Sequence, residues 1–149
     1  MESTTPLRKL VQRHAYTTIQ MHETIARKAG IPGTDHKYLG YLIEKGQMTA
    51  GELAELTGLT TGAVTGLIDR MEKKKLVKRE YDKEDRRKVF IVPDTKKIMA
   101  LMAPLYKDYR ARSEKLLSTF SKKEAAVIEN YLQQAVSIMH ETIDKLKSQ

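Results

Sequence analysis

The chain has 149 residues, 40% of them hydrophobic and 31% charged, which suits one domain or a small module with dimerising extensions. It has no cysteine, which excludes a disulfide framework, a zinc finger and a thiol redox switch. The net charge of +8 favours an anionic partner, but it does not distinguish nucleic acid from a membrane surface. No apolar run is long enough to cross a membrane and the first residues lack the features of a signal peptide, so we expect a cytoplasmic protein without a membrane partner.

The N-terminal third is predicted to form two helices. Thr5-Pro6 suits a helix start, because threonine can cap free amides and proline fits the first helical position. Apolar residues then recur at helical spacing until Gly30-Ile31-Pro32-Gly33 ends the helix. A lone helix cannot bury so long an apolar stripe, so it needs a partner surface. A second helix is predicted from Asp35 to Lys45.

Two short helices are predicted to meet at Gly58. Thr49 and Glu52 have the spacing of a capping box, which opens a helix that Gly58 ends within two turns. Ala54 is small enough for a close helix crossing, Gly58 can take the positive φ of a sharp turn, and Val64 can fill the space between the helices. This spacing indicates a helix-turn-helix rather than an ordinary helical hairpin.

The second of these helices, roughly Thr61 to Lys74, has an outer face of small and polar residues. Its two glycines each cost a helix about 1 kcal/mol relative to alanine. A helix that faces solvent gains nothing from them, whereas a helix pressed into a groove gains close approach. The face therefore favours DNA binding.

A β-hairpin is predicted after this helix. Residues 76–81 and 88–92 are rich in β-formers and flank a charged turn, and Pro93 closes the second strand. From residue 70 to residue 88 there are ten Lys or Arg against five Asp or Glu, so the basic excess lies on this wing. Asp85 lies two residues before Arg87, close enough to pair with it and fix the loop. A solvated charged turn is the alternative interpretation.

The C-terminal third is predicted to be helical. Asp94 or Thr95 caps a helix that contains Pro104, which predicts either a kink or two segments. Ser121 and Glu124 form a second capping box. The final helix that they open has an apolar side, made of Ile128, Tyr131, Leu132, Ala135, Met139, Ile143 and Leu146.

Four stretches resemble the multiple antibiotic resistance regulator (MarR) family of bacterial transcription factors. They are Glu52-Leu53-Ala54, the run from Val64 to Glu72, Leu76-Val77-Lys78-Arg79, and Asp82 through Arg87. The likeness is strong over residues 35–93 and rests on helical layout elsewhere. There are two departures from the family pattern. Lys75 stands where the family usually has a glycine, so the turn there differs or carries strain, and Val92-Pro93-Asp94 replaces the usual Leu-Thr.

The resemblance implies a mainly α fold with a small β-hairpin: a winged helix-turn-helix with N- and C-terminal dimerisation helices. Residues 1–33 would form the first dimerisation helix and residues 94–149 the C-terminal ones. Residues 34–93 would form the DNA-binding lobe, with the helix-turn-helix at about 50–74 and the wing at about 77–92. The implied protein is a homodimer that binds a palindrome in double-stranded DNA, with half-sites about 34 Å apart.

We expect a sequence-specific transcriptional regulator that acts as a repressor, although the sequence does not exclude an activator. A winged-helix module that binds an acidic protein is the alternative, but the small, polar face favours DNA. By resemblance an arginine near the wing tip enters the minor groove and an Asp–Arg pairing shapes the wing, with Asp85 as the acid. Arg86 and Arg87 are both candidates for that arginine, and Arg70 is assigned to a phosphate. The residues predicted to bind DNA are Thr61, Gly62, Thr65, Gly66, Arg70, Arg86, Arg87 and Lys88.

Many members of the family bind a small aromatic or amphipathic effector between the dimer helices and the DNA-binding lobe. Core packing is the alternative role for such side chains. The candidate pocket residues are Tyr16, Tyr38, Tyr41, Met48, Tyr106 and Tyr109.

We predict neither an enzyme nor a bound metal or cofactor. The four histidines, at positions 14, 22, 36 and 140, lack metal-ligand spacing. No serine stands in a nucleophile elbow and no glycine-rich phosphate loop follows a strand.

Overall fold

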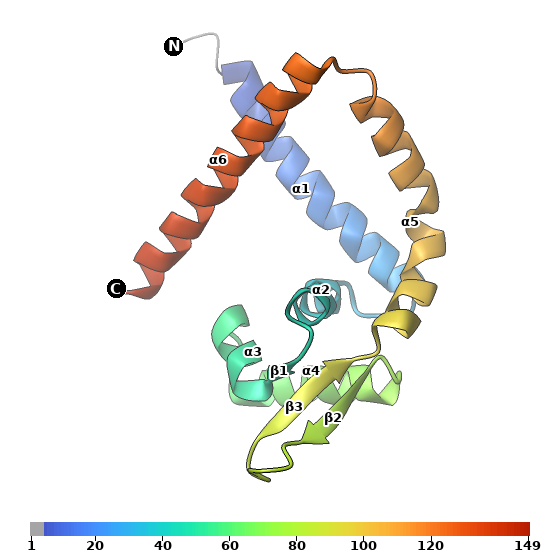
Figure 1. The fold of residues 1–149 in the computed structure, drawn as a ribbon, viewed down its shortest axis with the longest axis vertical. Helices are drawn as coiled ribbons and strands as arrows, with labels where there is room; N and C mark the ends of the chain where they lie inside the picture. The colour runs from blue at the N-terminus through green and yellow to red at the C-terminus, as the bar shows by residue number, and fades with distance from the viewer. Residues whose placement is uncertain (1–4) are drawn as a thin grey trace. The chain divides into compact units, whose positions relative to one another are not determined.

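The computed structural model describes residues 5–149 (Figure 1). Residues 1–4, the start of the predicted N-terminal segment, lie outside the described part. The chain divides into two compact units, the first ending at Tyr106 and the second running from Lys107 to Gln149. The elements are α1 (Thr5–Lys28), the 3₁₀ turn η2 (Gly33–Asp35), α2 (His36–Lys45), β1 (Met48–Thr49), α3 (Ala50–Thr57), α4 (Thr61–Lys73), β2 (Val77–Tyr81), β3 (Val89–Pro93), α5 (Thr95–Leu117) and α6 (Lys122–Lys147).

Both predicted capping boxes are confirmed. The Thr49 hydroxyl accepts from the Glu52 amide at 3.1 Å, and the Glu52 carboxylate accepts from the Thr49 amide at 3.0 Å. Ser121 and Glu124 exchange the same two hydrogen bonds at the start of α6. These bonds satisfy amides that have no partner within the helix. The positions at which α3 and α6 begin therefore follow directly from local sequence.

The helix-turn-helix also forms as predicted. Gly58 ends α3 with φ of 71°, in the left-handed region that glycine adopts without steric cost. Val64 on α4 is 1% exposed and Leu53 on α3 is fully buried. The two side chains belong to the same core, so the short helices α3 and α4 are held together by the side chains that the spacing indicated.

The wing is part of a three-stranded antiparallel sheet in the order β1-β3-β2. The predicted hairpin is confirmed, with Val77 opposite Pro93 and Tyr81 opposite Val89. β1 was not predicted. It consists of two residues, and its Met48 pairs with Ile91 of β3. A segment of this length carries no periodic pattern, and only its pairing with β3 makes it a strand.

The first unit has one continuous hydrophobic core. The core includes Ala26 of α1, Leu39 and Leu42 of α2, and Leu67, Ile68 and Met71 of α4. Ile98, Met102 and Tyr106 of α5 complete it. The beginning of α5 is therefore packed on the helix-turn-helix lobe, together with the end of α1.

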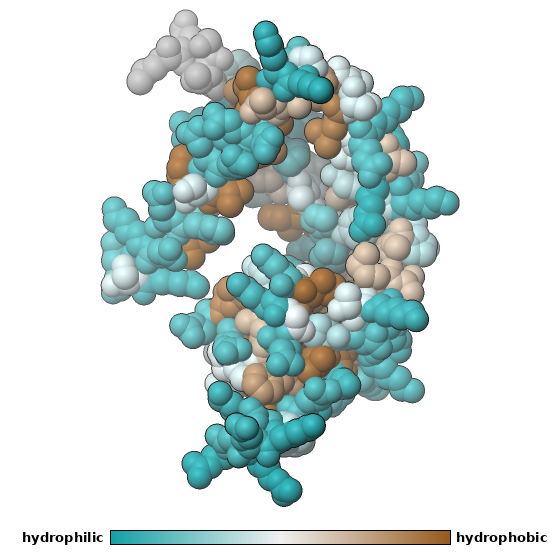
Figure 2. All heavy atoms as spheres, in the orientation of Figure 1, coloured by the Kyte–Doolittle hydropathy of each residue, from teal (hydrophilic) through white to brown (hydrophobic). Residues whose placement is uncertain are grey.

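The second unit buries none of its residues. On α6, Leu132 is 53% exposed and Leu146 is 64% exposed. In Figure 2 hydrophobic side chains show between hydrophilic ones along this helix. α5 continues through Pro104 without interruption as far as Leu117. This excludes the alternative of two segments, and a kink at Pro104 stays a prediction.

Lys75 follows α4 with φ of 57° and is the one non-glycine residue with positive φ among residues 5–149. A side chain in the left-handed region costs about 1–2 kcal/mol. The departure from the family's glycine therefore produces the predicted backbone strain. Among the same residues, no helix combines the length and apolar character needed to span a membrane.

Candidate nucleic-acid interface

The outer face of α4 is open to solvent. Thr61, Gly62 and Thr65 are exposed, and Gly66 is half-buried. Thr60 caps the helix, because its hydroxyl accepts from the Ala63 amide at 3.2 Å. The small residues of the outer face thus lie on a helix whose N-terminus is capped and whose opposite face is buried in the core.

Packing within the chain does not require either glycine of this face. A Cβ placed on Gly62 would meet no atom within 4 Å. A Cβ on Gly66 would come no closer than 3.5 Å, to a guanidinium nitrogen of Arg70, which is an ordinary contact. The glycines therefore cost helix stability without being required by internal packing.

Thr65 presents a hydrogen-bond acceptor on this face. Its hydroxyl donates to the carbonyl oxygen of Thr61 at 3.0 Å, one turn earlier in the helix. Because the hydroxyl carries one proton, the lone pairs of its oxygen are left for an external donor. The exocyclic amino groups of cytosine and adenine are such donors in the major groove.

Arg70 makes an ion pair that the sequence did not predict. Its Nε and Nη2 each lie 3.1 Å from a carboxylate oxygen of Asp35, which is 1% exposed. The hydrogen bond with Asp35 raises the pKa of Arg70, and the negative charge of Asp35 adds to this effect. The pair joins α4 to η2. The Arg70 side chain is still half exposed, and its contact with a phosphate stays a prediction.

Arg79 connects the wing to α4 and was missed as a functional residue. Its guanidinium lies 2.6 Å from Asp69 and 2.5 Å from Glu72. Its pKa is raised, first by the hydrogen bond with Asp69. The sequence did contain a signal for this contact: Asp69 and Glu72 are spaced to lie on one face of a helix, and the strand that follows carries the basic Arg79. The two ion pairs join β2 to α4.

The wing loop is shaped by hydrogen bonds from aspartates to backbone amides. Asp85 accepts from the Arg87 amide at 3.0 Å, and Asp82 accepts from the Glu84 amide at 2.8 Å. Asp85 therefore lies where it was predicted. Asp85 thus pairs with Arg87 through the Arg87 amide, whereas the ion pairs found in residues 5–149 include none between Asp85 and the Arg87 guanidinium. Aspartate side chains commonly accept hydrogen bonds from backbone amides one or two residues further along a turn.

The basic residues of the wing tip, Arg86, Arg87 and Lys88, are exposed. Figure 2 shows hydrophilic side chains over this end of the first unit. Salt bridges found in the described chain involve none of the three residues. Their charges are therefore available to an anionic partner.

The residues predicted for an effector pocket do not share one environment. Tyr38, Met48 and Tyr106 belong to the hydrophobic core and Tyr41 packs against it. Tyr16 is 73% exposed on α1, and Tyr109 belongs to the second unit and is 47% exposed. For the first four residues, the structure favours the alternative of core packing.

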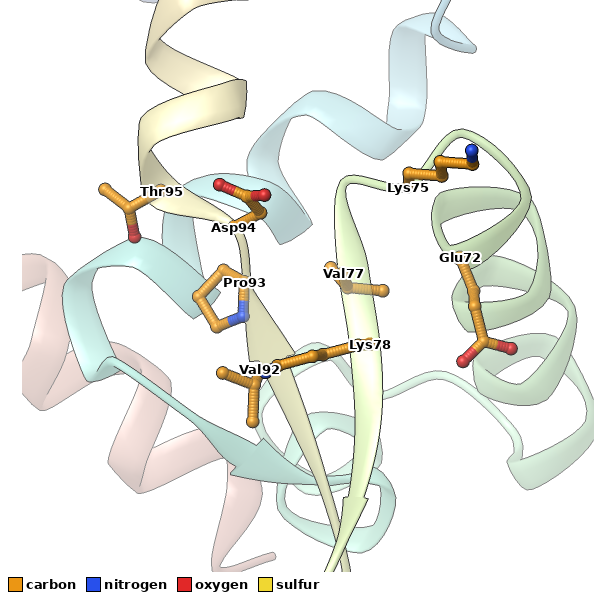
Figure 3. A pocket seen from close by; sticks show the side chains of 8 residues that line it. All are labelled: Glu72, Lys75, Val77, Lys78, Val92, Pro93, Asp94 and Thr95. Carbon is orange, nitrogen blue, oxygen red and sulfur yellow. The ribbon is translucent and has the colours of Figure 1, made fainter.

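An open cavity of about 700 Å³ lies elsewhere in the first unit. Figure 3 shows that α4, the turn after it, both wing strands and the start of α5 surround it. It is lined by Glu72, Lys75, Val77, Lys78, Val92, Pro93, Asp94 and Thr95. None of the residues predicted for the effector borders it.

The sequence model of the MarR family matches residues 29–88. An uncharacterized HTH-type transcriptional regulator of Bacillus subtilis, YcgE, is 39% identical over 142 residues, which cover 93% of this chain and 90% of YcgE. The chain belongs to the MarR family. The resemblance seen in the helix-turn-helix and wing motifs is thus confirmed across nearly the whole chain.

Solved structures agree with the winged helix-turn-helix fold of this MarR-family chain. A MarR family protein from Bacillus stearothermophilus superposes with a TM-score of 0.74 at 28% identity, covering 93% of this chain and 96% of that protein. A mutant MarR of E. coli complexed with operator DNA has a TM-score of 0.58 at 20% identity, covering 89% and 95%. The second likeness concerns the fold alone.

Proposed function

We propose that this chain is a homodimeric transcriptional regulator that binds a palindromic operator in double-stranded DNA. The observation that carries the proposal is the exposed face of α4, whose glycines have no role in internal packing. That face lies next to a wing with three unpaired basic residues, and Arg79 holds the wing against α4. The operator complex of the E. coli MarR mutant, a protein of the same fold, supports this assignment.

In the proposed complex α4 enters the major groove. Thr61, Gly62, Thr65 and Gly66 face the base edges, and the Thr65 oxygen accepts a hydrogen bond from a base. Arg86 or Arg87 reaches into the minor groove, where the negative potential is strongest when the groove is narrow. Lys88 and Arg70 contact phosphates, which fix the register of the protein on the duplex.

The uncovered apolar side of α6 supports the proposed homodimer. A two-fold dimer places two copies of α4 on half-sites about 34 Å apart. We further propose that the protein represses transcription and that a small aromatic or amphipathic effector releases it. Membership of the MarR family supports this last part.

The test begins by selecting bound duplexes from a random DNA pool with the full chain. A two-fold symmetric motif is the expected result, and recovery of unrelated sequences would contradict the proposal. Thr65→Val, measured on the selected operator, should lose roughly tenfold in affinity and change the preferred base at one position of each half-site.

Arg87→Ala and Arg86→Ala should weaken binding to all sequences by similar factors. Lys88→Ala, which removes a proposed phosphate contact, should lower the slope of log affinity against log salt concentration by about one unit. Arg8→Ala, which removes an exposed arginine of α1, is the matched charge control and should bind like the parent chain. If the wing variants behave like this control, the wing assignment is wrong.

A further inference from the structure

Two histidines and a tyrosine from three separate helices meet in the first unit. His22 lies on α1, His36 is the first residue of α2, and Tyr106 lies on α5. The Tyr106 hydroxyl oxygen is 2.5 Å from His22 Nδ1 and 2.8 Å from His36 Nε2. The two imidazole rings are stacked, with centroids 5.0 Å apart. We call these three residues the His-Tyr-His cluster.

The number of protons in the His-Tyr-His cluster limits its charge. A hydroxyl has one proton, so Tyr106 donates to at most one imidazole while the other imidazole donates to the phenol oxygen. When both rings are protonated, neither can accept from the hydroxyl, and two cations face each other at stacking distance. The arrangement of hydrogen bonds is therefore most favourable when the rings are not both charged.

The surroundings of the cluster give little compensation for added positive charge. Tyr106 is 8% exposed and both histidines are partly buried, next to the buried Ala26 and Met102. Burial in an apolar environment opposes the charged form of an imidazole.

The carboxylates closest in sequence to the histidines are already paired. Glu23, beside His22, lies 3.8 Å from Arg27. Asp35, beside His36, is held by Arg70. The other neighbours, Lys37 after His36 and Lys107 after Tyr106, are cations. Both carboxylates that adjoin the histidines in sequence are thus engaged by arginines.

The direction of the titration follows from these contacts. Burial lowers the pKa of His36 below its ordinary value of 6.5, and the charge of His22 lowers it further. In the unfolded chain His36 takes up its proton first as the pH falls. The unfolded state therefore binds more protons between 6.5 and the lowered pKa, and stability decreases as the pH falls through that window.

We propose that His22, His36 and Tyr106 form a proton-sensitive latch, which holds α5 on α1 and α2 at neutral pH and releases it in acid. Tyr106 is the last residue of the first unit. The latch therefore acts at the point on α5 from which the second unit continues. Acidification would loosen the packing of α5 on α1 and α2 at this junction.

The first measurement follows the histidine ring protons of the full chain by NMR between about pH 8 and pH 5. His36 is expected to titrate below 6.5, and the signals of Tyr106 should change with it. A pKa for His36 at or above 6.5 would overturn the proposal. This readout needs no variant and no DNA.

The second measurement compares thermal unfolding at about pH 7.5 and about pH 5.5. His36→Gln keeps a polar group that cannot be charged, so its midpoint should fall by roughly 3 °C less than that of the parent between these pH values. His14→Gln and His140→Gln replace exposed histidines and should keep the full loss. Equal losses in His36→Gln and these controls would overturn the latch.

The consequence for regulation rests on the proposed function. If the latch positions the lobe for DNA, acid should weaken operator binding more in the parent chain than in His36→Gln, by about threefold or more. If the chain shows the expected NMR titration and pH-dependent unfolding but binds no duplex DNA, the latch proposal stands and the proposed function is wrong. A chain that binds DNA equally well at both pH values would remove the regulatory role of the latch.

Discussion

The two units of this chain differ in how completely they bury their apolar side chains. In the first unit, 17 hydrophobic residues form one core and none is more than 8% exposed. In the second unit, Leu132, Ile138 and Leu146 are each more than half exposed. Long amphipathic helices obtain most of their stability from burial of an apolar face. The core of the first unit therefore has its stabilising partners within the chain. The apolar side of α6 has none there, and Leu7, Leu10 and Ile19 of α1, in the first unit, are likewise more than half exposed.

This difference connects DNA binding to assembly. A lobe with its own hydrophobic core can hold the exposed face of α4 in one geometry. In the proposed dimer, the second unit would be fully stabilised only when its apolar side packs against that of another chain. The folding of the second unit and the concentration of the protein are then linked. In the proposed homodimer, two weak half-sites would act together as one strong operator.

The largest expected effect comes from breaking the apolar side of α6. Leu132→Lys should abolish dimerisation at micromolar concentration. Burial of this leucine contributes about 2–3 kcal/mol in each of the two chains, so the dimer dissociation constant should rise by roughly a thousandfold. Sedimentation over a concentration series measures this shift. Gln133→Lys adds the same charge to an exposed polar position of α6 and should leave the dimer intact. A Leu132→Lys chain as dimeric as this control would refute the proposed interface.

An intermediate effect is expected from breaking the ion pair that closes the first unit. Arg70→Met leaves the buried carboxylate of Asp35 without a partner, which should lower the free energy of unfolding by about 2–3 kcal/mol. Adding Asp35→Asn should restore part of this loss, because the buried charge is then gone. Denaturant titration measures both variants.

The matched control for this pair lies on the exposed part of α5. Arg112 is 3.8 Å from Asp108, and both side chains are more than four-fifths exposed. Arg112→Met should therefore leave the stability nearly unchanged. If Arg70→Met is no more destabilising than Arg112→Met, the pair with Asp35 does not hold α4 in place.

The smallest effect concerns the exposed outer face of α4, whose glycines internal packing does not require. Gly62→Ala should raise the free energy of unfolding by roughly 0.5–1 kcal/mol, because its Cβ would meet no other atom. Operator affinity should nevertheless fall by roughly tenfold. Gly40→Ala on α2 also meets no atom and should stabilise the chain without changing DNA binding. Unchanged affinity in Gly62→Ala would mean that α4 does not require close approach.

The local features were predictable because each depends on a few neighbouring residues. Both capping boxes and the left-handed turn at Gly58 follow from rules that act over one turn. The strained backbone at Lys75 was expected from the resemblance, because the family usually has a glycine at that position. The buried position of Val64 followed from helical spacing. The helix-turn-helix and the small, polar outer face of α4 could be predicted from the sequence for the same reason.

Other features depend on residues that only folding brings together. β1 is too short to have a pattern and exists through its pairing with β3. Asp85 was expected to pair with Arg87, and only the folded loop shows that it does so by accepting a hydrogen bond from the Arg87 amide. The candidate effector residues were chosen by type, and the structure distributes them between core and surface.

The sequence by itself determined the helix-turn-helix, the wing and their polar reading face, since these follow from local spacing and charge. Only the tertiary structure decided which charges are paired. Asp35 and Arg70 are 35 positions apart, and His22 and Tyr106 are 84 apart. Contacts at such separations depend on how the helices pack around the core, and no pattern within a single helix records them. The reading surface is thus a local property of the chain, whereas the contacts that hold it in place are properties of the fold.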